Sequence, residues 1–174
     1  MHIRFNVNRK KTAEAIIWIV ERGESNVYNI MKILYAADKY HLNRYGRPVT
    51  GDRYVAMQYG TVPSAAYGMV NAPELGIGFK KSGHRVIVDK GRTFNKGKFS
   101  ETDEEALEHG FKEYGGLSFS AVVDKNHRER SWVLATRRAP DTSDASEVLF
   151  EDMIDGRKKW LIDDLKEMGQ YAVI

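Results

Sequence analysis

Three polar residues lie at spacings that would suit chemistry. Asp38 and His41 are three residues apart in a segment with helical periodicity, so their side chains project from one face of that helix. Asp52 follows a turn bounded by Gly46 and Gly51, which can bring it back toward the other two. Two carboxylates and an imidazole are suited to binding a divalent cation or to general acid–base catalysis. Alternatively, Asp38 and His41 hydrogen-bond to the turn and to each other, because buried polar groups need partners.

Several other chemistries lack the residues that they need. The chain contains no Cys, which excludes disulfides, thiolate zinc ligands and a cysteine nucleophile. It has no Gly-x-Ser-x-Gly elbow, no glycine-rich phosphate loop and no two His residues four apart on a helix. Apart from the three polar residues above, no motif indicates a metal or cofactor site, and we expect no cofactor and no metal.

The length and hydropathy favour a packed domain in the cytoplasm. The 174 residues suit one domain spanning 1–174, and 42% hydrophobic residues with 11% aromatics favour a core. The longest apolar run, residues 15–20, has six residues, whereas a membrane-spanning helix needs roughly 20. The polar residues among the first eleven do not resemble a signal peptide. We therefore expect a cytoplasmic protein with no membrane partner.

The charges are distributed unevenly along the chain. Residues 1–100 carry 17 Lys and Arg against 7 Asp and Glu, whereas residues 101–174 carry 10 against 17. A basic half can attract an acidic partner or nucleic acid, such as operator DNA, with tyrosines available for stacking. Alternatively, the two halves pack together and neutralise each other. If a partner binds the basic half, the candidate contact residues are Arg44, Arg47, Lys80 and Lys81.

The periodicity predicts a mainly helical α+β fold, in which a small antiparallel β-sheet or hairpin is inserted mid-chain. Helix formers follow capping residues at several points, and glycines or prolines end the segments. The expected strands are 53–59 and a hairpin of 77–81 with 85–89. Residues 139–146 are expected to form a loop. The expected helices are 12–22, capped by Thr12, then 25–45, 63–70, 100–114, 118–126, 147–155 and 157–168.

One long contiguous stretch resembles a known family. Residues 32–56, KILYAADKYHLNRYGRPVTGDRYVA, resemble the signature of the Panacea domain, found in SocA-like antitoxins and phage-associated GepA-like proteins. Residues 60–64, GTVPS, resemble a second family pattern, with Thr61 where the family usually has proline. His127 and Trp132 match a third pattern, although Arg130 and Ser131 replace its usual proline and alanine. The signature residues are Tyr35, Asp38, His41, Tyr45, Gly46, Arg47, Pro48, Gly51, Asp52, Gly60, Pro63, His127 and Trp132.

The resemblance implies an antitoxin that is not an enzyme. Panacea domains neutralise unrelated toxins by direct binding, and some members hand the bound toxin to a cellular protease. The family has no accepted catalytic residues or cofactor, so the signature residues are expected to be structural. The expected partner is a cognate protein toxin.

Two alternative functions remain open at this stage. The first is a small metal-dependent hydrolase or nuclease that uses Asp38, His41 and Asp52. The second is a DNA-binding regulator that uses the basic N-terminal half.

Overall fold

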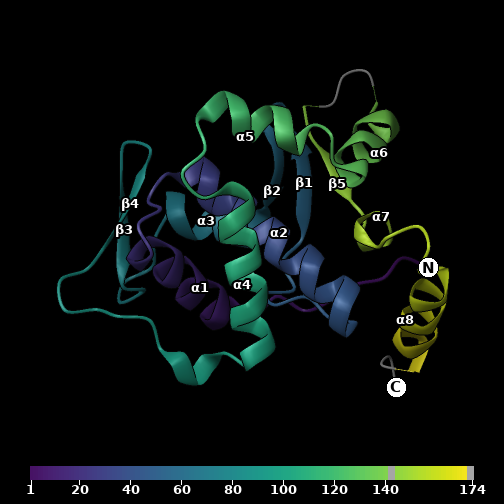
Figure 1. Cartoon of the computed structure of the whole chain (residues 1–174), viewed down its shortest axis with the longest axis horizontal. Coiled ribbons are helices and arrows are strands. Elements are labelled where there is room, and N and C mark those ends of the chain that lie inside the picture. The colour runs from purple at the N-terminus through teal and green to yellow at the C-terminus, as the bar shows by residue number, and fades with distance from the viewer. Residues whose placement is uncertain (141–143, 172–174) are drawn as a thin grey trace.

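The computed structural model describes residues 1–140 and 144–171 and has the predicted mainly helical α+β fold (Figure 1). Its helices surround one long central helix, and its strands form two small antiparallel sheets. The helical elements are α1 (Arg9–Glu21), α2 (Val27–Tyr45), α3 (Ser64–Asn71), the 3₁₀ turn η1 (Lys96–Lys98), α4 (Glu101–Tyr114), α5 (Phe119–Asn126), α6 (Arg130–Arg138), α7 (Phe150–Met153) and α8 (Lys159–Tyr171). The strands are β1 (Tyr54–Met57), β2 (Gly60–Pro63), β3 (Phe79–Ser82), β4 (Arg85–Val88) and β5 (Ser146–Val148).

Helix α2 lies at the centre because apolar residues occur around most of its circumference. Ile33 and Leu34 belong to a core cluster shared with α1, α3 and α4. Tyr35 and Leu42 belong to a second cluster shared with β1, β5 and the C-terminal helices. Helix α2 therefore joins the two cores, and side chains along it can reach several elements.

Helices α2 and α4 approach closely at Gly110. A Cβ atom at this position would lie 2.4 Å from the carbonyl oxygen of Ile33 and 3.2 Å from the amide nitrogen of Ala37. Both atoms belong to the backbone of α2, so they cannot rotate away as a side chain would. Only glycine permits this spacing between the two helices.

Gly110→Ala should therefore lower the free energy of unfolding by about 2–3 kcal/mol, as overpacking of a well-packed core does. Chemical denaturation of both proteins measures the difference. The control is Gly68→Ala in α3, where no atom lies within 4 Å of the added Cβ. That variant should be as stable as the parent or about 0.5–1 kcal/mol more stable. Equal stability of Gly110→Ala and the parent would contradict this packing.

The two sheets connect different parts of the chain. The first has the order β2-β1-β5, and both pairs are antiparallel. Val55 pairs with Val62 on β2 and with Glu147 on β5, so the sheet joins the mid-chain to the C-terminal region. The second is the β3–β4 hairpin, which is tied to the start of α2 by a bridge between Asn26 and Arg85.

Polar side chains define where the helices begin. Asn26, Ser100 and Ser118 each accept a hydrogen bond from a backbone N–H of the first turn, and such caps stabilise helix starts. The prediction that Thr12 caps the first helix was wrong. Asn8 caps α1 instead, by accepting from the amide of Lys11 at 3.0 Å, so the helix begins at Arg9.

Besides α1, several elements differ from the sequence-based expectation. Residues 147 and 148 were expected in a helix but lie in β5, because they pair with β1. Helix α6 and strand β2 were not expected. Helix α6 packs against β1, and strand β2 pairs with it. The expected loop 139–146 includes residues 141–143, which lie outside the described residues. Its last residue, Ser146, is already in β5.

The basic first half of the chain pairs with the acidic second half. Lys11 and Arg47 both contact the buried carboxylate of Asp103, at 2.6 and 3.0 Å. Further pairs of this kind are Arg22–Glu108, Lys39–Glu129, Arg44–Glu105, Arg4–Glu147 and Arg53–Glu147. The two halves therefore neutralise each other in part. Among the described helices, none combines the length and apolar character that crossing a membrane requires.

Candidate functional site

The Asp38 carboxylate holds the turn that follows α2. Its Oδ1 accepts hydrogen bonds from the amides of Val49 and Thr50, at 2.9 and 2.8 Å. Its Oδ2 accepts from the Thr50 hydroxyl at 2.6 Å and from the Tyr54 hydroxyl at 2.9 Å. Asp38 is fully buried, and these four donors all come from the turn or from β1. The carboxylate therefore fixes the end of α2 to the start of the sheet.

The pKa of Asp38 reflects two opposing effects. Burial raises the pKa to about 6, while the hydrogen bonds from Thr50 and Tyr54 lower it. Loss of solvation disfavours the charged form, and hydrogen bonds donated to that form favour it. With both oxygens occupied by protein donors, Asp38 offers no free lone pair toward solvent-accessible space.

Asp52 anchors a different element. Its two oxygens accept hydrogen bonds from the amides of Ala65 and Ala66, at 2.9 and 2.8 Å. These amides belong to the first turn of α3, where backbone N–H groups have no partner within the helix. Burial raises the pKa of Asp52, and the two amides lower it. Asp52 thus caps α3 and fixes it to the turn.

His41 joins α2 to the turn and to α4. Its Nδ1 lies 2.6 Å from the carbonyl oxygen of Arg47, so this nitrogen carries the proton and donates. Its Nε2 is 2.9 Å from the Thr102 hydroxyl and 3.5 Å from Asp103. Burial lowers the pKa of His41, and the hydrogen bond to Arg47 raises it. The buried imidazole is therefore held at both nitrogens.

The three residues first singled out do not share a ligand-binding space. Asp38, His41 and Asp52 bond to separate parts of the backbone, and no hydrogen bond joins Asp38 to His41 in residues 1–140 and 144–171. The expectation that these two side chains bond to each other was wrong. The described part of the chain also contains no group of three or more His, Asp or Glu placed to hold a metal ion. Their arrangement suits a clasp around a turn, which we call the signature clasp (Asp38, His41 and Asp52).

The conformation of this turn depends on its glycines. Gly46 and Gly51 have φ values of +74° and +71°, which non-glycine residues rarely adopt. A Cβ at Gly51 would also lie 2.6 Å from the carbonyl oxygen of Asn6. Pro48 is buried between them, and Arg47 reaches from the turn to Asp103 on α4.

A second set of buried polar side chains, those of Lys32 and Asn126, covers the β2 edge of the three-stranded sheet. The carbonyl of Thr61 on β2 accepts from Lys32 Nζ at 2.8 Å, and its amide donates to Asn126 Oδ1 at 2.6 Å. These backbone groups would otherwise be open to another strand. A Cβ at Gly60 would lie 2.4 Å from Asn126 Oδ1 and 2.8 Å from Lys32 Cε, so the adjacent signature glycine makes room for both side chains.

Lys32, Thr61 and Asn126 were not predicted as site residues. Lys32 lies within the apolar run of α2 and is 1% exposed, and burial lowers its pKa to about 7. In the sequence, the only indication of a role for Lys32 was its position among the apolar residues of the predicted helix 25–45. Tyr35, which was predicted, donates to or accepts from Ser131 at 2.6 Å, so Ser131 replaces the usual alanine with a partner for this tyrosine.

Comparison with protein families matches residues 30–133 to the family described as Antitoxin SocA-like, Panacea domain. This match covers more than half of the chain. The chain belongs to the SocA-like Panacea-domain family. No curated protein and no solved structure matches the chain in the corresponding searches.

The matched Panacea region includes both sets of buried polar residues described above. It begins within α2 and ends within α6, so it contains the signature clasp and the β2 edge but neither α1 nor α8. Two further signature residues, His127 and Trp132, hold the β1–β2 turn. His127 Nε2 donates to the carbonyl of Gln58 at 2.9 Å, and Trp132 Nε1 donates to that of Met57 at 3.1 Å. Their rings stack with centroids 4.0 Å apart.

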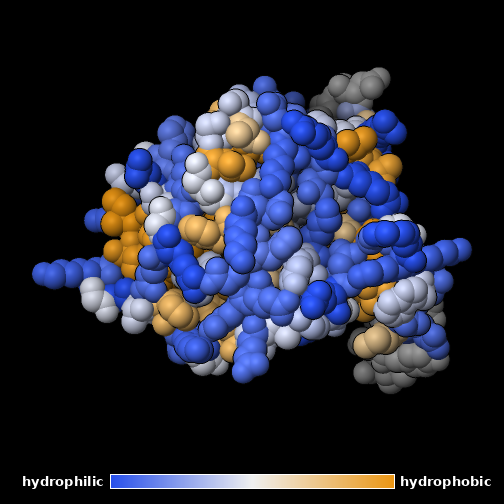
Figure 2. All heavy atoms as spheres, viewed as in Figure 1, coloured by the Kyte–Doolittle hydropathy of each residue, from blue (hydrophilic) through white to orange (hydrophobic). Residues whose placement is uncertain are grey.

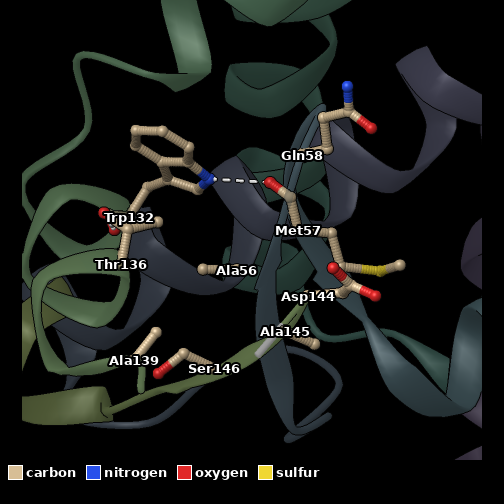
Figure 3. A pocket seen from close by; sticks show the side chains of 9 residues that line it. All are labelled: Ala56, Met57, Gln58, Trp132, Thr136, Ala139, Asp144, Ala145 and Ser146. Carbon is tan, nitrogen blue, oxygen red and sulfur yellow. Dashed lines mark hydrogen bonds between the residues drawn. The ribbon is translucent and has the colours of Figure 1, made fainter. Parts of the chain in front are cut away.

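A cleft of about 580 Å³ lies beside Trp132, at the end of the matched Panacea region and the start of the segment that follows it (Figure 3). The indole and Thr136 form one wall, and Ala56 and Met57 of β1 form another. The hydrogen bond from the indole to Met57 crosses the upper part of the cleft. Among the described residues that line it, Asp144 alone is titratable, so the cleft supports no catalytic assignment.

The four candidate partner-binding cations do not form one surface. Arg44 and Arg47 lie at the end of α2 and pair with Glu105 and Asp103 of α4. Lys80 and Lys81 lie on the β3–β4 hairpin, on the opposite side of the Panacea domain in Figure 1. Lys81 donates to Asn71 at 2.7 Å. A partner could therefore use Lys80 and Lys81 without breaking an ion pair, but not Arg47.

Proposed function

We propose that this protein is an antitoxin that neutralises a cognate protein toxin by direct protein–protein binding. Membership of the SocA-like Panacea-domain family carries the proposal. The three residues of the signature clasp support it, because they are buried and bonded to the backbone rather than directed toward a substrate. Neutralisation needs only a stable complex, and an interface of roughly 1,600 Å² can reach nanomolar affinity.

The alternative functions have less support. A metal-dependent hydrolase would need Asp38, His41 and Asp52 to converge, whereas each bonds to a different part of the backbone. A DNA-binding regulator would need a free basic surface, whereas many cations of the first half pair with carboxylates of the second. Transfer of the toxin to a cellular protease would be a later step that also requires the complex.

The test is growth rescue by co-expression. The probe is the toxic product of the gene adjacent to the one that encodes this protein. We expect expression of this protein alone to leave growth unchanged. Co-expression should restore colony formation to the level without toxin, and the two proteins should co-purify.

The matched control is Trp160→Ser, a change of a 61% exposed residue on α8, outside the matched Panacea region. It should rescue as well as the parent. Rescue without a complex would instead indicate an enzymatic antidote. Absence of rescue would contradict the proposed function.

A further inference from the structure

Four aromatic rings from separate elements meet at one place on the surface. Tyr28 of α2 contacts Tyr59 of the β1–β2 turn, His84 of the β3–β4 turn and Phe119 of α5, with ring centroids 6.3, 5.8 and 5.0 Å apart. Tyr59 and Phe119 also contact each other at 5.3 Å. Together with Leu117, we call these residues the aromatic patch. Figure 1 shows the β3–β4 turn and the starts of α2 and α5 close together.

The aromatic patch is exposed although it is apolar. Tyr59, Phe119 and Leu117 are 44%, 46% and 36% exposed. Figure 2 shows apolar side chains at the surface where α4 ends and α5 begins. An exposed cluster of rings of this kind suits the centre of an interface that buries roughly 800 Å² per partner. Tyrosine and other aromatic residues dominate such centres.

Buried polar residues hold the α4–α5 loop, which carries Leu117 and leads into Phe119. Asn29 Nδ2 donates to the carbonyls of Tyr114 and Leu117, at 3.0 and 2.9 Å. Glu24 accepts from the amides of Asn26 and Gly116, both at 2.8 Å. These contacts fix the α4–α5 loop to the start of α2. A surface that is ordered before binding loses less conformational entropy on association.

The two turns are fixed in a similar way. The signature residues His127 and Trp132 hold the carbonyls of Gln58 and Met57, immediately before Tyr59. The amide of Val27 donates to the carbonyl of His84 at 2.9 Å. The signature residues His127 and Trp132 therefore position the exposed ring of Tyr59. A role confined to the interior of the protein would not require this.

The charges near the patch favour an acidic partner. Arg85 follows His84 and donates to the Ser25 hydroxyl, and Arg128 follows His127; both are exposed, and neither has a carboxylate partner among the residues described. Both oxygens of Glu24 are occupied by backbone amides. Successive residues of a helix are about 100° apart around its axis, so Asp124 lies about 140° from Phe119 on α5. Its side chain therefore projects from a different side of the helix than the Phe119 ring.

The ring geometry favours a protein over a nucleic acid. The planes of Tyr28, Tyr59 and Phe119 meet at 85°, 72° and 70°, so ring edges cover parts of neighbouring faces. Stacking of successive bases would need open parallel faces. We propose that the aromatic patch is the toxin-binding surface, and that it accepts a protein segment with apolar side chains flanked by carboxylates. This inference rests on the proposed function.

The test compares Tyr59→Ser and Phe119→Ser with Tyr67→Ser. Tyr67 on α3 is 42% exposed, so the control removes a similar ring from a similar environment. The probe is the purified toxic product of the adjacent gene. Each patch variant should weaken binding about 30-fold or more, as loss of an interface hot spot does, whereas the control should bind like the parent. Arg85→Glu should slow association and reduce its dependence on salt.

The outcomes separate the inference from the function on which it rests. If the parent does not bind the toxin, the proposed function fails and the inference fails with it. If the parent and all serine variants bind equally, the inference is overturned and the function stands. Melting curves show whether the variants fold, and Tyr59→Phe should restore binding where Tyr59→Ser lost it. Two other results would assign the patch to another occupant and overturn the inference. In the first, the parent is a dimer and Tyr59→Ser is a monomer. In the second, the patch variants lose binding to single-stranded DNA but still bind the toxin.

Discussion

Asp38→Ala should lower the free energy of unfolding by about 3–5 kcal/mol, because four buried donors lose their acceptor at once. The donors are the amides of Val49 and Thr50 and the hydroxyls of Thr50 and Tyr54, all within 2.9 Å of the carboxylate. Asp38→Asn should also destabilise the protein, because an amide has one acceptor oxygen where the carboxylate has two. Equilibrium unfolding in urea measures both changes.

Two controls make this result specific. Asp124→Ala removes an exposed carboxylate from α5 and should change stability by no more than about 0.5 kcal/mol. Adding Zn²⁺, Mn²⁺ or Mg²⁺ should leave the melting temperature of the parent unchanged. A metal-dependent rise that vanishes in Asp38→Ala would contradict the clasp and return the metal-dependent hydrolase to consideration.

The second large effect is a dependence of stability on pH that originates at Lys32. Burial lowers the pKa of Lys32 from 10.5 to about 7, so the unfolded chain binds more protons than the folded protein between these values. Stability therefore rises with pH across this window. From pH 7 to pH 9, the contribution of Lys32 to the free energy of unfolding should increase by about 2 kcal/mol.

Lys32→Met should remove this increase, and the difference between parent and variant isolates it from other titrating groups. Urea unfolding at pH 7, 8 and 9 provides the measurement. Lys80→Met, a change of an exposed lysine, should keep the slope of the parent. Parallel curves for the parent and Lys32→Met would mean that Lys32 remains charged in the folded protein.

Local sequence features predicted much of the helical framework. The caps at Asn26, Ser100 and Ser118 lie at the starts of the predicted helices 25–45, 100–114 and 118–126, because a cap depends on residues within one turn. Helix α6 was missed because its N-cap, Glu129, makes no side-chain capping bond. Strand β5 has three residues, too few for a periodic pattern, and each of its pairs with β1 spans at least ninety positions.

The sequence indicated which residues form the candidate site but not which groups they bond to. The spacing of Asp38 and His41 placed them on α2, and the glycines located the turn. The partner of His41 on α4, Thr102, is 61 positions away, and nothing in the local pattern specifies it. The aromatic patch combines four elements, so it becomes visible only in the folded chain.

The central claim is that this protein neutralises a toxin by forming a complex with it. Titrating the purified protein into an assay of the purified toxin, the product of the adjacent gene, tests that claim most directly. Direct binding predicts that toxin activity falls linearly and reaches its minimum at an equimolar ratio, where a stable complex elutes in gel filtration. Complete loss of toxin activity at a small fraction of that ratio, with no complex detected, would show turnover and contradict the account.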